Sequence, residues 1–215
     1  MCDEGTPSER DREACREVYG YARADRKRRY GFLEGLYRSG HTQEATLLCL
    51  CYIDDLAGLG WPEVQGSKRR FVDVLTQYGG DEALGEIMPG HLLKAFFGDL
   101  APKPLKALAP KIETAIGHSG HLHSPEEIVE LAKPHITTDE LNLLKKELWR
   151  GRLAAAAYDV LRCPAVHELS AHDGIGYEPR DSPGEARTLD FRMLHECLQR
   201  LLPIAWQRFM DREDM

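Results

Sequence analysis

Two residues in the last third of the chain, Arg162 and His167, have the side chains that acid–base and anion chemistry require. An imidazole titrates near neutral pH and can accept or donate a proton, whereas a guanidinium keeps its positive charge. In a straight helix, two residues five positions apart point about 140° away from each other. Pro164 lies between them. Because proline interrupts helical hydrogen bonding, we expect a kink there that can turn both side chains into one cleft.

The helix that carries Arg162 is predicted to begin near Thr138. A threonine cap is followed by two acidic residues, Asp139 and Glu140, which favour the positive end of a helix. Residues on one face then recur at three- and four-residue steps: Leu141, Leu144, Leu148, Gly151, Ala155 and Tyr158. Arg162 continues this row. A buried arginine needs an anionic partner, because it cannot lose its proton.

An earlier segment offers that partner. Nearly every residue of 45–59 is apolar, on every face, which is typical of a helix buried on all sides. Its only charged residues are Asp54 and Asp55. We predict that one of them, Asp54 first, contacts Arg162. The alternative is that either aspartate reaches solvent near the end of the helix.

Two segments resemble bacterial members of the HEPN family: YDVLRCPAVHE at 158–168 and CYIDDLAGL at 51–59. The family signature is an arginine followed four to six residues later by a histidine. That spacing alone arises by chance, so the resemblance depends on the residues that surround the motif in the two segments. The resemblance implies an all-α fold, a HEPN-like helical bundle whose two core helices carry these segments. In the family the residue after the arginine is often asparagine or another strongly polar residue, and here it is Cys163.

The chemistry that this resemblance implies is metal-independent RNA cleavage, in which a ribose 2'-OH attacks the adjacent phosphorus. His167 would transfer the proton, and Arg162 would bind the scissile phosphate. Glu168, beside the histidine, could orient its ring. With two histidines, one could accept a proton and the other could donate one. The resemblance therefore also implies a homodimer with facing motifs, in which each copy supplies one histidine. No cofactor and no metal is expected.

Candidate RNA-binding residues precede the motif. Arg150 and Arg152 form a basic group that leads into it, and Tyr158 either stacks on a base or packs in the core. A second basic run, residues 23–29, is either a binding patch or a solvated helix face. The net charge of −7 argues against broad nonspecific nucleic-acid binding, which depends on many cations.

Two functions therefore remain open. The first is a HEPN-type endoribonuclease in phage defence or a toxin–antitoxin pair, with RNA and an antitoxin or another protein as partners. The second is a non-catalytic HEPN-like scaffold that binds RNA, a nucleotide or a protein. Cys163 and the acidic net charge favour the second, and the intact Arg162 and His167 favour the first. Without the resemblance, these two residues would be interpreted as an ion-paired interior arginine and a surface histidine.

The chain is predicted to form one helical domain over residues 1–215. We expect disorder at 1–8, an insertion of short helices at 62–136 and a mobile loop at 170–187. Within the insertion, three prolines predict a connector without helical structure over 99–110.

Composition favours a cytoplasmic protein that does not enter a membrane. No apolar run approaches the roughly 18 residues needed to span a bilayer, and the first residues are too polar for a signal peptide. The six cysteines lack the spacing of a zinc site, so reduced thiols are expected. Three histidines at 118–123 form either a surface loop or, less favoured, a metal site.

Overall fold

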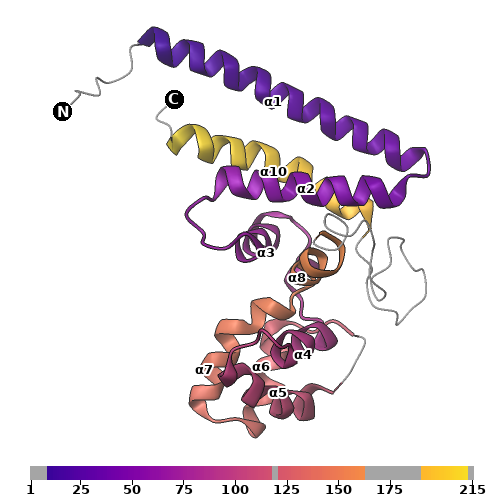
Figure 1. The fold of residues 1–215 in the computed structure, drawn as a ribbon, viewed down its shortest axis with the longest axis vertical. Helices are drawn as coiled ribbons and strands as arrows, with labels where there is room; N and C mark the ends of the chain where they lie inside the picture. Colours follow the sequence, from indigo (N-terminus) through magenta and orange to yellow (C-terminus); the bar gives the residue numbers. More distant parts are fainter. Residues whose placement is uncertain (1–8, 118–120, 163–189, 213–215) are drawn as a thin grey trace, which may run out of the picture.

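The computed structural model describes residues 9–117, 121–162 and 190–212, and in these ranges the chain is all-α (Figure 1). No strand occurs in the described part, which contains only isolated backbone bridges from Ile87 to His123 and to Arg152. The expected all-α class is thereby confirmed, and a HEPN-like arrangement of the helices stays a prediction. The disorder expected at 1–8 and the loop expected at 170–187 fall outside the described residues.

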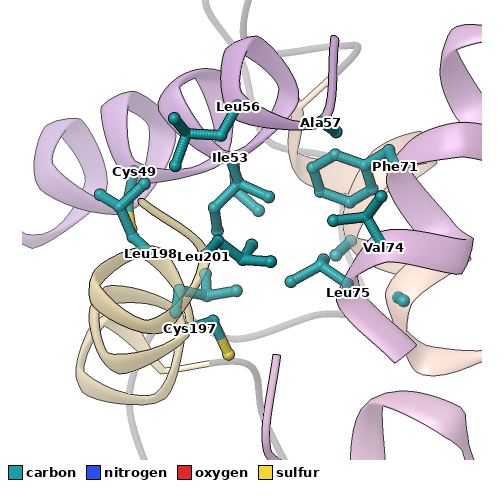
Figure 2. Packing of buried hydrophobic residues seen from close by; sticks show 14 of the residues in the cluster. Cys49, Ile53, Leu56, Ala57, Phe71, Val74, Leu75, Cys197, Leu198 and Leu201 are labelled. Carbon is teal, nitrogen blue, oxygen red and sulfur yellow. The ribbon is translucent and has the colours of Figure 1, made fainter. Parts of the chain in front are cut away.

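The main core is built from α1 (Glu9–Arg38), α2 (Thr42–Gly60), α3 (Ser67–Tyr78) and α10 (Phe191–Arg212). Figure 2 shows side chains of α2, α3 and α10 pointing toward one another, among them Ile53, Phe71 and Leu201, all without exposed surface. The apolar character of α2 explains its central place, since it packs against each of the other three. Its burial is incomplete, because Tyr52 and Leu59 stay partly exposed.

The contact between α2 and α10 depends on a small residue. A Cβ atom added to Gly60 would lie 2.9 Å from the Ala205 Cα and 3.0 Å from the Ala205 Cβ. Both neighbouring atoms are fixed by the helix backbone, so a larger residue at position 60 would separate the helices. The two helices can pack this closely only because glycine and alanine meet at the crossing.

A second core lies below the main bundle in Figure 1. It contains α4 (Pro89–Phe97), α5 (Lys103–Ile116), α6 (Pro125–Ala132) and α7 (Thr138–Glu147), with the short 3-10 turn η2 (Lys133–His135). The turn η1 (Glu82–Gly85) packs in the main core through Ala83 and Leu84. The buried residues of the second core run from Ile87 to Leu148, whereas those of α3 belong to the main core. The second core thus starts and ends later than the predicted insertion at 62–136.

Residues 99–110 do not form the predicted connector, and that prediction was wrong. α5 starts at Lys103, and Pro110 lies inside it. Two of the prolines precede or open the helix, where the missing N–H costs nothing. The third is tolerated because a buried face made of Leu105, Leu108, Ala109, Ile112 and Ile116 fixes the helix in the second core.

The helix predicted to run unbroken from Thr138 toward Arg162 begins as expected but is interrupted. Thr137 caps α7 through a capping box with Glu140. The chain then passes through η3 (Leu148–Gly151), α8 (Leu153–Ala156) and η4 (Ala157–Arg162), with Arg152 in extended geometry. A Cβ on Gly151 would lie 2.6 Å from the Leu92 Cβ, so this glycine lets α4 approach closely. The chain therefore does not continue as one helix from Glu147 to Leu153.

Cys49 and Cys197 are buried free thiols. Burial raises the pKa of Cys49 well above its usual value and raises that of Cys197 to about 12. These two thiols therefore stay protonated and unreactive at neutral pH. Among the described residues, no helix is long and apolar enough to cross a membrane.

Candidate functional site

The turn that leads to Arg162 is held against the start of α3. η4 is π-helical, a rare geometry that often occurs at functional sites. The Tyr158 hydroxyl lies 2.9 Å from the Ser67 Oγ, and its ring meets Phe71 edge-on with centroids 5.3 Å apart. Tyr158 is 6% exposed. Tyr158 therefore packs in the core, which was one of the two roles expected for it. A buried ring cannot stack on a base without rearrangement.

Asp159 fixes η4 to both cores. Lys68 of α3 donates from Nζ to its Oδ2 at 2.5 Å, and the buried His91 of α4 brings Nε2 within 3.2 Å of the same oxygen. Burial alone would raise the pKa of Asp159, but the contacts with His91 and Lys68 outweigh it, so the pKa is lowered. The carboxylate therefore remains charged and links three segments that are distant in sequence.

Replacing Asp159 with asparagine is expected to lower the free energy of unfolding at pH 7 by about 1 kcal/mol, a value reduced for partial solvent exposure. Because the folded-state pKa lies below the ordinary value of 3.8, the charged side chain stabilises the fold above that pH. The difference from wild type should shrink as the pH falls below about 4. Urea unfolding across this pH range measures it. Asp99→Asn, at an exposed site, should show no such difference, and a pH-independent gap for Asp159→Asn would contradict the assignment.

A cationic cluster surrounds Trp149 of η3, beside η4. The guanidinium carbons of Arg69 and Arg150 each lie 4.8 Å from the indole centroid, and the Lys68 Nζ lies 5.7 Å away. The indole is only partly buried. Cations over an aromatic face gain from its quadrupole, and the same face and guanidinium planes can stack on nucleobases.

Arg152 adds a positive charge that has no ion pair within the described ranges. Burial lowers the pKa of its guanidinium; Arg69 adds to this effect, while Asp73 and Glu126 oppose it. Its Nε is buried and donates no hydrogen bond to any described residue. A desolvated cation with an unused donor is suited to an anionic ligand such as a phosphate.

The remaining cations of the cluster are each paired with a carboxylate. Arg69 donates to Asp73 at 2.7 Å, and Arg150 donates to Glu147 at 2.6 Å. The first turn of α3, which contributes Lys68 and Arg69, contains no acidic residue. Its free amides and positive dipole end therefore add to the attraction for an anion.

Of the residues predicted from the sequence, Arg150, Arg152 and Tyr158 lie in this region, and their role in RNA binding stays a prediction. The side chain of Arg162 and all of Cys163, His167 and Glu168 lie outside the described residues. Their geometry, and any contact of Arg162 with Asp54 or Asp55, stays a prediction.

The two aspartates of α2 occupy different environments. Asp55 is 52% exposed and accepts a hydrogen bond from the Arg26 Nε at 3.2 Å, which joins α2 to α1. Asp54 is half-buried. Asp55 thus reaches solvent, as the alternative for these aspartates expected, and Asp54 remains the predicted partner of Arg162.

Five residues of the Trp149 cluster and of the Asp159 contacts were not singled out from the sequence: Lys68, Arg69, His91, Trp149 and Asp159. Trp149 could have been found, because it directly precedes the predicted Arg150. Lys68 and Arg69 belong to a helix assigned to the insertion, and nothing in the sequence links them to Asp159, 91 residues away from Lys68. Only the packing of α3 against η4 brings these groups together.

Among the described residues, no group of three or more His, Cys, Asp or Glu side chains could hold a metal ion. Part of the histidine run at 118–123 lies outside the described ranges. Within them, the backbone of His123 exchanges hydrogen bonds with Ile87, and its Nδ1 lies 3.7 Å from Glu127. This histidine has a structural role at the edge of the second core.

Comparison with models of known protein families, with curated proteins and with solved structures finds no match to this chain.

Proposed function

We propose that this chain binds single-stranded RNA and cleaves it without a metal ion, as an endoribonuclease of the HEPN type. The observation that carries the proposal is the cationic cluster around Trp149, placed beside the π-helical turn that ends at Arg162. Cationic grooves with an aromatic platform are how proteins bind single-stranded nucleic acid. The cluster would hold the substrate, and the motif residues would act on it.

In the proposed reaction the ribose 2'-oxygen bonds to the adjacent phosphorus and the bond from phosphorus to the 5'-oxygen breaks. His167 takes the proton of the 2'-OH, and a second acid returns a proton to the leaving 5'-oxygen. Arg162 binds the phosphate oxygens whose negative charge increases in the transition state. The products are a 2',3'-cyclic phosphate and a free 5'-hydroxyl.

A second copy of the chain would supply the second acid, so the active form is proposed to be a homodimer. A ribonuclease of this kind acts in the cytoplasm as a defence protein or toxin, and an antitoxin would be its natural protein partner.

The direct test is to incubate purified protein with structured and unstructured RNAs in EDTA and to analyse the 3' ends of the fragments. Cyclic phosphates formed in EDTA support the proposal. Cleavage that occurs only after metal is added back, or fragments with 3'-hydroxyl ends, would contradict the chemistry.

Binding can be tested separately from cleavage with the double variant Arg69→Gln, Arg150→Gln. We expect an affinity for single-stranded RNA about tenfold lower, and a weaker salt dependence by about 0.7 in log–log slope for each lost phosphate contact. Fluorescence anisotropy at several salt concentrations measures both. The matched control is Lys103→Gln, Lys106→Gln, which removes two exposed cations of α5. Equal losses in the two variants would mean that charge alone, and not the Trp149 cluster, governs binding.

The non-catalytic scaffold is the second candidate, favoured by Cys163 after the motif arginine and by the net charge of −7. It predicts RNA binding that depends on Arg69 and Arg150, with intact RNA recovered. Binding without cleavage by a folded protein would select it.

A further inference from the structure

The long helix α1 presents a second face that no described element covers. One face packs on α2 and α10 through residues such as Tyr30 and Leu33, which are 3% and 0% exposed. Figure 1 shows α1 along the outer edge of the molecule, with α2 and α10 on one side of it only. On the outward side, Val18, Tyr21 and Phe32 are 64%, 78% and 61% exposed.

These exposed residues follow a regular seam along the helix. It is formed by residues at alternating steps of four and three: Ala14, Val18, Tyr21, Asp25, Arg28, Phe32 and Gly35. That spacing places them on one stripe about 32 Å long and is the repeat that joins two helices side by side. Large exposed apolar side chains gathered in one stripe mark an interaction surface. We call this stripe the α1 seam.

The charges of the α1 seam indicate what pairs with it. Asp25 and Arg28 lie at its centre, where they form an ion pair within the helix, and Asp25 also accepts a hydrogen bond from the Arg29 Nε at 2.7 Å. The side chains of Arg28 and Asp25 are 82% and 33% exposed. If a second copy is laid antiparallel, with a two-fold axis near residues 26 and 27, Asp25 lies opposite Arg28 of that copy. The same axis places Tyr21 opposite Phe32. A parallel pairing would set like charges against each other.

We propose that the α1 seam is a homodimer interface in which two copies pair antiparallel through their α1 helices. Each aromatic residue covers one from the other copy, and the central charges form a four-residue network across the axis. The small Gly35 lies opposite Val18 and gives it space. The interface does not depend on the RNA-cleaving function. It is a second contact between copies, separate from the facing-motif contact of the proposed active dimer, because α2 and α10 lie between α1 and α8 in Figure 1.

Sedimentation equilibrium from about 1 to 200 µM protein tests the interface. We expect a monomer–dimer equilibrium in this range, as befits a small interface. Phe32→Ser should raise the dissociation constant about tenfold or more, because it removes an aromatic residue from both halves of the symmetric contact. Leu100→Ser, at a fully exposed site in the second core region, should leave the constant unchanged.

Charge reversal tests the direction of pairing. Asp25→Arg alone should weaken the dimer about tenfold, since two arginines then meet across the axis on each side. The double variant Asp25→Arg, Arg28→Asp restores opposite charges and should return to within about threefold of wild type. Circular dichroism confirms that each variant is folded. A wild type that stays monomeric, a dimer insensitive to Phe32→Ser, or one weakened equally by Leu100→Ser would overturn the proposal.

Discussion

Replacing His167 with alanine is expected to slow RNA cleavage by about 10²- to 10⁴-fold, the usual contribution of a general acid or base. The imidazole is the group near Arg162 that titrates close to neutral pH, so its loss leaves the 2'-OH proton without an acceptor. RNA affinity should stay within about twofold, because the cations that bind phosphate are unchanged. Single-turnover cleavage in EDTA and anisotropy on the same protein measure the two effects.

The control for His167→Ala is His135→Ala, which removes an exposed histidine from η2. It should cleave at the wild-type rate. If His167→Ala retained full activity, the proposed chemistry would be wrong, or the activity would come from a contaminating nuclease. If neither wild type nor variant cleaved any RNA, the scaffold function would replace the enzyme.

Replacing Phe71 with alanine is expected to lower the free energy of unfolding by about 3–5 kcal/mol. Phe71 has no exposed surface and projects from α3 toward the centre of the main core (Figure 2). Its ring also supports Tyr158 of η4, so a cavity there removes packing from the turn that leads to Arg162. Urea unfolding with a fitted m-value measures the loss.

The matched control for Phe71→Ala is Phe97→Ala, at the end of α4, where the side chain is 45% exposed. We expect a cost below about 1 kcal/mol, since little packing is lost. Similar costs for both variants would show that α3 is less tightly packed than its burial indicates. A changed m-value for Phe71→Ala alone would indicate altered cooperativity between the cores.

Local signals in the sequence were sufficient for much of the fold. Thr137 and Ser124 each begin a helix through a capping box, because a short side chain and a glutamate three residues later satisfy free amides without any distant contact. The apolar run of residues 45–59 predicted a central helix, and α2 occupies that place. Such features depend on neighbours within one turn, so they can be read from the chain.

Features that depend on distant neighbours were missed or misread. Pro110 predicted a break, but packing of the α5 face in the second core outweighs one lost hydrogen bond. Gly151 resembled an ordinary helical residue, yet its missing side chain makes room for Leu92 of α4. The periodicity of a sequence shows which face of a helix is apolar, but it does not show which other element packs on that face.

By itself the sequence determined the all-α class, the helix start at Thr138 and the central helix over residues 45–59. Only the tertiary structure decided that Trp149 collects cations from two segments and that Lys68, His91 and Asp159 join α3, α4 and η4. It also decided that one face of α1 remains uncovered. The physical reason is that helix formation follows from short-range hydrogen bonds and caps, whereas these charge clusters and free faces arise only when separate helices are packed together.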